Sequence, residues 1–142
     1  ETFSFRADEE STALPVYAST PLRYLYEPNA AILKAGAYKL PAVRFGLQKF
    51  HPNSHLYTSD KCIENFPGRI FEVVRYSHFN KQELKAFKGD VRQANLTVRN
   101  FPASVAELRK RLKIKDGGDE YWFATTCGED EHLLIACKKS PI

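Results

Sequence analysis

A capping box at residues 104–107 defines the start of a helix in the second half of the chain, and this helix constrains the fold more than any other feature. The Ser104 hydroxyl is expected to accept a hydrogen bond from the Glu107 amide, while the Glu107 carboxylate accepts one from the Ser104 amide. Apolar residues follow at helical spacing and predict one buried face, made of Val105, Leu108 and Leu112. The glycine pair at 117–118 predicts where the helix ends.

Segments with the composition of strands surround this helix. Four of them are rich in β-branched and aromatic residues, at 70–76, 94–98, 121–127 and 132–138. The last two flank a short polar turn and predict a hairpin. A second helix is expected after Asn80, closed by Gly89. The order β-α-β-α-β-β predicts an α+β fold of the ferredoxin-like type, with helices on one face of a mostly antiparallel sheet.

The first half predicts a smaller α+β segment. Residues 3–6 alternate like a strand and lead into a polar acidic stretch. Pro28 suits the first turn of a helix, and apolar residues on two adjacent faces up to Leu40 predict that this helix is widely buried and bends or ends at Pro41. Short strands are expected at 47–50 and 55–58. The turn at Pro67-Gly68 separates the halves, so we expect domains at 1–65 and 66–142.

The composition is that of an ordinary globular protein, with 43% hydrophobic and 27% charged residues in 142. No apolar run approaches the length of a membrane span, and the start has no secretory pattern. Because the chain opens on Glu1 and contains no Met, we expect it to be an excised piece of a longer polypeptide. Its three cysteines form no C-x-x-C pair, which fits a reducing cytosol and a cytoplasmic location.

The net charge of +4 is concentrated in one short segment. Residues 105–115 hold five basic groups against one acid, whereas the rest of the chain holds sixteen of each sign. Arg109, Lys110 and Lys113 lie on the side of the predicted helix away from its apolar face, where a phosphate backbone can bind. The alternative is a solvated helix face whose cations complement the negative end of the helix dipole.

Two further groups of residues are candidates for a site. Arg99 and Asn100 leave a strand near the positive amino end of the basic helix, a position that favours anions. The alternative is loop packing, with Asn100 bonded to backbone. The aromatic segment that precedes the first helix is a candidate for contact with substrate or with another domain, or else for core packing. Its candidate residues are Tyr24, Tyr26, Glu27 and Asn29.

The sequence predicts neither a metal site nor a catalytic residue. His51, His55 and Cys62 lie near one another in sequence, but Pro52 and Asn53 place a turn between the histidines, and no Glu follows the first one. No G-x-G-x-x-G, Walker or G-x-S-x-G pattern occurs.

Several long motifs resemble one bacterial family of class I SAM-dependent methyltransferases. Residues 24–36 and 51–59 resemble the small ferredoxin-like segment that follows the catalytic domain in that family. Residues 66–71, 94–102 and 107–118 resemble its terminal THUMP-like domain. Together the resemblance covers most of residues 22–138.

The resemblance implies a non-catalytic module that recognises the substrate of a methyltransferase. THUMP-type domains are associated with RNA-modifying enzymes, so RNA is the implied partner, together with the module's own catalytic domain. S-adenosylmethionine is implied for the parent enzyme, whereas this chain lacks the family's glycine-rich loop and its Asn/Asp-Pro-Pro motif. The alternative is a scaffold or dimerisation module that packs on the catalytic domain, or on a second copy, without binding nucleic acid.

Overall fold

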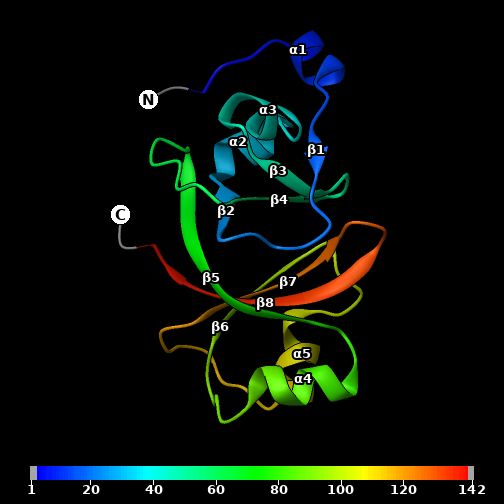
Figure 1. The fold of residues 1–142 in the computed structure, drawn as a ribbon, viewed down its shortest axis with the longest axis vertical. Helices are drawn as coiled ribbons and strands as arrows, with labels where there is room; N and C mark the ends of the chain where they lie inside the picture. Colours follow the sequence, from blue (N-terminus) through cyan, green and yellow to red (C-terminus); the bar gives the residue numbers. More distant parts are fainter. Residues whose placement is uncertain (1–2, 141–142) are drawn as a thin grey trace.

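A single eight-stranded sheet runs through the computed structural model, which describes residues 3–140 (Figure 1). The strand order is β1-β3-β4-β2-β5-β8-β7-β6. The elements are, in chain order, α1 (Ala7–Thr12), β1 (Val16–Tyr17), β2 (Tyr24–Pro28), α2 (Ala30–Ala35), α3 (Leu40–Phe45), β3 (Gln48–His51), β4 (Ser54–Ser59), β5 (Gly68–His78), α4 (Lys81–Lys88), β6 (Asn95–Arg99), α5 (Val105–Leu112), β7 (Tyr121–Cys127) and β8 (Glu131–Lys139). The expected α+β class is confirmed.

Strand β5 joins the two halves of the chain. It pairs antiparallel with β2 on one side and with β8 on the other, so the sheet continues from the first half into the second. The register with β8 shifts between Val73 and Arg75, an irregularity of the kind that bends a strand. In Figure 1, β5 curves strongly, with β2, β3 and β4 above β7 and β8 and with α4 and α5 below them.

Strand β7 is buried on both faces, because the helices cover one face and the first half of the chain covers the other. Trp122 and Ala124 pack with Leu84 and Leu108 of the helices, whereas Phe123 packs on the opposite face with residues of the first half. Strands covered on both sides read as nearly continuous apolar runs, and residues 121–124 of β7 form such a run. Burying each large side chain stabilises the fold by roughly 1.5–3 kcal/mol.

Both predicted helices of the second half are confirmed, with corrections to α5. The Ser104 hydroxyl accepts from the Glu107 amide at 3.1 Å, and the Glu107 carboxylate accepts from the Ser104 amide at 3.1 Å. The helix ends at Leu112 and not at the glycine pair, because Ile114 turns into the core after Lys113 adopts a left-handed conformation. Val105 is 36% exposed in the first turn, so the buried face consists of Leu108 and Leu112 alone.

The first half departs further from expectation. Residues 3–6 form no strand, and part of the acidic stretch is helical, as α1. The single helix predicted after Pro28 is two helices, because Gly36 ends α2 with φ of +79° and Pro41 lies in the first turn of α3, where proline needs no amide partner. In α2 only Ile32 is buried, so the expectation of wide burial is wrong. The two short strands are confirmed as β3 and β4.

Within the described residues, no helix has both the length and the apolar character needed to cross a membrane.

Candidate nucleic-acid interface

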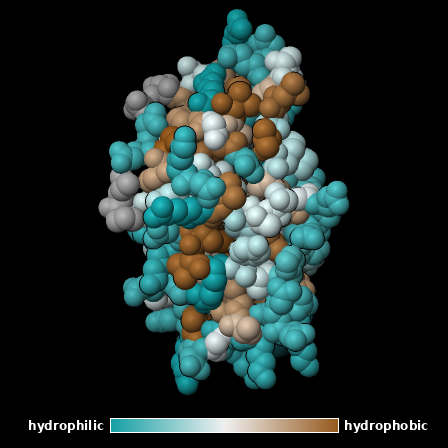
Figure 2. Space-filling model, viewed as in Figure 1, coloured by the Kyte–Doolittle hydropathy of each residue, from teal (hydrophilic) through white to brown (hydrophobic). Residues whose placement is uncertain are grey.

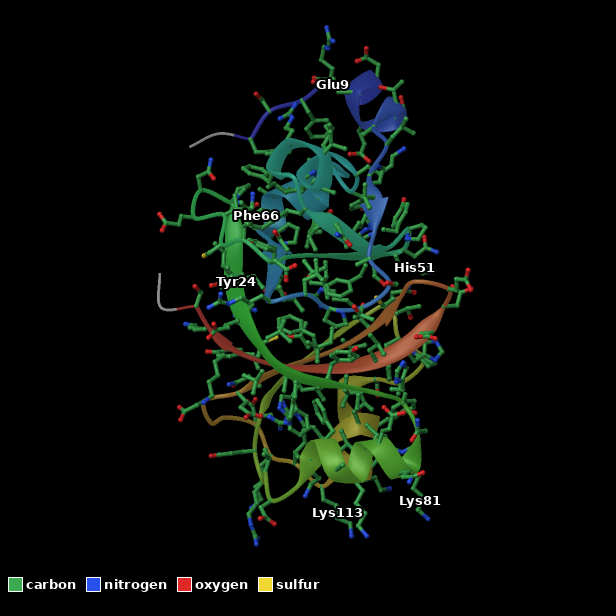
Figure 3. All side chains as sticks on the ribbon, viewed as in Figure 1. Glu9, Tyr24, His51, Phe66, Lys81 and Lys113 are labelled. Atoms are coloured by element: carbon green, nitrogen blue, oxygen red, sulfur yellow. The ribbon has the colours of Figure 1, made fainter. Side chains whose placement is uncertain are left out.

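A basic groove lies between α4 and α5. It has a volume of about 430 Å³ and an apolar floor that includes Leu84 and Leu112. Five cations line it: Lys81, Lys85 and Lys88 from α4, Arg111 from α5, and Lys113 directly after α5. None of its described lining residues is an acid. Figure 3 shows Lys81 and Lys113 extending from the same end of the molecule, and the surface there is largely hydrophilic in Figure 2.

The groove cations are held apart from acidic partners. None of the five forms an ion pair within residues 3–140. The spacing of Lys81, Lys85 and Lys88 places them on one side of α4 over about 10 Å. Arg111 lies with its guanidinium carbon 4.5 Å from the centre of the Phe79 ring, which orients it without neutralising it. The result is a row of uncompensated positive charge on each side of an apolar floor.

The residues predicted on the basic helix separate into two kinds. Lys110 and Lys113 are exposed, and only Lys113 lines the groove. Arg109 points elsewhere, because its guanidinium donates to the Ala94 carbonyl at 3.3 Å and to the Asp116 carboxylate at 3.0 Å. Arg109 therefore fastens α5 to the start of β6.

Sequence reasoning missed the lysines of α4. A signal was available, since three lysines recur at i, i+4 and i+7 within a helix that was itself predicted. That α4 lies beside α5 required the structure.

Asn100 occupies a left-handed position after β6, with φ of +56°. Its side-chain amide donates to the Ser54 hydroxyl at 3.1 Å, and its carbonyl accepts from the Thr126 hydroxyl at 2.5 Å. These bonds connect Asn100 to β4 and β7, and they match the loop-packing alternative more closely than a free anion site.

A second pocket, of about 580 Å³, brings together residues that the sequence placed in separate groups. The Glu27 carboxylate, with only 9% of its side chain exposed, lies between two arginines. One oxygen accepts a hydrogen bond from Arg69 Nε at 2.7 Å and lies 2.6 Å from Nη2 of the same guanidinium, and the other accepts from Arg99 at 3.3 Å. Asn29 also lines this pocket, and its side chain caps α2 by accepting from the Ile32 amide at 3.0 Å.

The two tyrosines of the aromatic segment occupy different environments. Tyr26 is fully buried, packs edge-on against Phe66 and donates its hydroxyl to the Lys61 carbonyl. Burial raises the pKa of this phenol. Tyr24 is half-buried beneath Arg23, whose guanidinium carbon lies 5.3 Å from the ring centre. Core packing therefore describes the position of Tyr26, whereas Tyr24 retains some accessible surface.

The histidines and cysteines do not gather. His51 contacts Asp130 at 2.6 Å, whereas the His55 ring stacks on Tyr38 with centres 3.7 Å apart. In the described part of the chain, no group of three or more His, Cys, Asp or Glu side chains is arranged to hold a metal ion. Cys127 and Cys137 are buried, and burial raises the pKa of both thiols.

Comparison with known proteins assigns both halves of the chain. Residues 24–67 match a ferredoxin-like domain, and residues 68–139 match the family described as THUMP domain-like. A crystal structure named "putative methyltransferase from Porphyromonas gingivalis W83" is 41% identical, with a TM-score of 0.90 over 99% of this chain. This chain spans only 36% of the length of that protein. Comparison with curated proteins finds no match. Because the second match covers half of the sequence, the chain belongs to the THUMP-like domain family.

Proposed function

We propose that this chain is the non-catalytic substrate-recognition module of a SAM-dependent methyltransferase and that it binds RNA along the groove between α4 and α5. The THUMP-like family and the methyltransferase name of the similar structure support this assignment at the level of the module. The observation that carries the RNA assignment is the groove itself, in which five cations and no acid of the described chain line an apolar floor.

Helix dipoles do not account for these cations. Cations near the carboxyl end of a helix are favourable by about 0.3–1 kcal/mol, which rationalises Lys88 and Arg111. Lys81, however, is the first residue of α4, where the dipole opposes a positive charge. A polyanion in the groove would explain why cations occur at both ends. Release of counterions from its phosphates would supply the binding free energy.

The residues of this chain do not fit S-adenosylmethionine. Cofactors of this size commonly bind where loops leave the carboxyl ends of adjacent parallel strands. Within residues 3–140 the parallel pairs are β1 with β3 and β6 with β7, at opposite edges of the sheet, and the chain has no glycine-rich loop. We assign the cofactor and the methyl transfer to a separate catalytic domain.

A scaffold role has its own supporting observation, an apolar patch beside β1. Leu14, Val16 and Val43 are 88%, 65% and 49% exposed and line a groove of about 350 Å³. Figure 2 shows hydrophobic surface near β1, at the end of the molecule opposite α4 and α5. Because this chain spans about a third of the similar protein, the occupant we assign to this patch is the catalytic domain of the parent chain.

The RNA assignment is tested by the salt dependence of binding to a hairpin RNA. Replacing Lys85 by Ala and Lys113 by Asn, which tolerates the left-handed position, should weaken binding across sequences. A plot of log affinity against log salt concentration has a negative slope, and the magnitude of this slope should decrease by about 0.7–0.9 per lost phosphate contact. The matched control removes the same number of positive charges elsewhere, at Lys34 and Lys61, which are exposed and lie outside the groove. Equal slopes in both double variants and the unchanged protein would leave the scaffold role as the function.

A further inference from the structure

The pocket around Glu27 is a separate site from the basic groove. Its residues come from the end of β2, the start of α2, the start of β5 and the end of β6. Glu27 and Arg69 are direct partners in the register of β2 and β5, so the pocket forms where the two family domains join. It shares no lining residue with the groove between α4 and α5.

The charges of this pocket do not balance. One carboxylate lies between two guanidinium groups, which leaves one positive charge in excess. Both oxygens of Glu27 are already occupied, one by Arg69 and the other by Arg99. Among the residues that the structure describes, no other acid lines the pocket. An added ligand therefore encounters a net charge of one, and a group with a single negative charge would neutralise it.

The arginines retain donors for such a group. Arg69 uses Nε and Nη2 on Glu27, and its Nη1 makes no hydrogen bond within residues 3–140. Arg99 uses Nη1 on the Val98 carbonyl and Nη2 on Glu27, and its Nε makes no hydrogen bond to another described residue. Their side chains are 51% and 42% exposed, so these N–H groups remain accessible. Each guanidinium is thus fixed on one edge and open on another.

The arginines are also oriented before any ligand arrives. The guanidinium carbon of Arg69 lies 5.1 Å from the centre of the Phe71 ring and 5.9 Å from that of Tyr121. Together with the contact to Glu27, this leaves little side-chain freedom to lose on binding. The lining of the pocket also includes Pro28, Ala30 and Leu33, which provide apolar surface for a sugar or a base.

We propose that this pocket binds one phosphodiester group of a polynucleotide between Arg69 and Arg99, at a subsite separate from the groove. The single charge of a phosphodiester matches the excess charge of the pocket, and arginine forks match the geometry of phosphate oxygens. The inference rests on the proposed RNA-binding function, and it specifies a second contact that would fix the register of the RNA across the junction of the two domains.

The competing explanation is a structural clamp, in which Glu27 only holds the two halves together. The two explanations differ in what they predict for E27Q: tighter phosphodiester binding if the pocket is a binding site, and no effect on binding if it is only a clamp. Without the carboxylate charge the pocket carries two positive charges, so a phosphodiester should bind about three- to tenfold more tightly. R99Q removes the excess charge and should weaken binding by a similar factor, whereas R99K should retain most of it. A pure clamp gives no phosphodiester binding to change in any of these variants.

The probe is adenylyl-adenosine, which carries a single phosphodiester, with adenosine as the uncharged control. In titrations followed by NMR, the dinucleotide should shift the amide resonances of residues 27–33 and 68–70, whereas adenosine should not. The free chain and each variant are first compared by circular dichroism. If E27Q fails to fold, the contrast between R99Q and R99K still decides the question. Shifts confined to α4 and α5, or affinities that do not follow the pocket charge, would overturn the proposal.

Failure here is distinguishable from failure of the proposed function. The groove variant with Lys85→Ala and Lys113→Asn should lose affinity for hairpin RNA yet bind the dinucleotide as the unchanged chain does. If hairpin RNA binding depends on the groove lysines while the dinucleotide leaves the pocket amides unmoved, only the subsite is disproved. A free mononucleotide that binds as tightly as the dinucleotide would reassign the pocket to a small-molecule phosphate and would also overturn the polynucleotide assignment.

Discussion

Arg75 and Glu120 form a two-bonded ion pair with N to O distances of 2.9 and 3.0 Å, and it joins β5 to the segment that enters β7. The Arg75 Nε also donates to the carbonyl of Phe87 at the end of α4, and Glu120 accepts from the Trp122 indole at 2.8 Å. Their side chains are 30% and 19% exposed, so water screens the pair only in part. This network holds α4, and with it one wall of the basic groove, against the sheet.

Replacing Glu120 by Gln should lower the free energy of unfolding by about 1–3 kcal/mol, since it leaves Arg75 without its charged partner. The hydrogen bond from Arg75 holds the pKa of Glu120 below its usual value. A lowered folded pKa gives stability that is present above the unfolded pKa of about 4.3 and is lost as pH falls through the folded value. Urea unfolding should therefore show the difference between the two proteins shrinking below about pH 4. A constant difference down to pH 2 would contradict this.

Leu108→Ala should lower the free energy of unfolding by about 2–5 kcal/mol, because Leu108 lies on the inner face of α5 and is fully buried. Val105→Ala on the same helix is the matched control and should cost far less, since Val105 is 36% exposed. Chemical denaturation of both variants measures the difference. Equal losses would show that the orientation of α5 described here is wrong.

Local signals predicted this helix well and its surroundings poorly. The capping box, the β-branched and aromatic composition of β7 and the polar turn between β7 and β8 depend on residues within a few positions of one another, and all three occur. The break at Gly36 also has a local cause, but apolar spacing that continues up to Leu40 concealed it. The prediction that Val105 is buried was wrong, because the helical spacing of apolar residues does not show where a helix extends past its neighbours.

The candidate sites depend on contacts between distant segments. Arg109 was predicted on a free face, yet Asp116 and the Ala94 carbonyl bind it. Glu27 and Arg99 are 72 residues apart and meet only because β2 pairs with β5 and β6 ends beside them. No period or motif in one sequence specifies such pairings, so the charge of this pocket could not be predicted.

Lys49 should titrate near neutral pH, since burial lowers its pKa to about 7. Its side chain is fully buried, with Nζ donating to the carbonyls of His51 and Ser54 at 2.7 and 2.8 Å. A folded pKa below the unfolded value of about 10.4 means that the unfolded chain binds more protons between these values, so this lysine makes stability rise with pH across that window. The rise should be absent from Lys49→Met. An ordinary Nζ titration near pH 10, observed by NMR, would contradict the prediction.

The isolated chain should transfer no methyl group to RNA. The sequence has no glycine-rich loop, and within the described residues parallel strand pairs occur only at the two edges of the sheet, which is the basis of this prediction. Incubation with labelled S-adenosylmethionine and total RNA tests this, with an intact methyltransferase as the positive control. Labelled RNA, or tight binding of the cofactor to this chain, would overturn the assignment of catalysis to another domain.

Arg109 and Lys113 should separate stability from RNA binding, although they lie one turn apart on the same basic segment. Arg109→Ala removes the bonds to Asp116 and to the Ala94 carbonyl and should lower the free energy of unfolding by roughly 1 kcal/mol while leaving the salt slope for hairpin RNA unchanged. Lys113→Asn should do the reverse, because Lys113 lines the groove, forms no ion pair in the described chain, and occupies a left-handed position that Asn tolerates. Lys110→Ala is the control, since Lys110 is exposed on the same segment but does not line the groove. Measuring denaturation and salt-dependent binding on all three variants decides the matter. If Arg109→Ala and Lys110→Ala reduce the slope as much as Lys113→Asn does, the RNA contacts the outer face of α5 and not the groove.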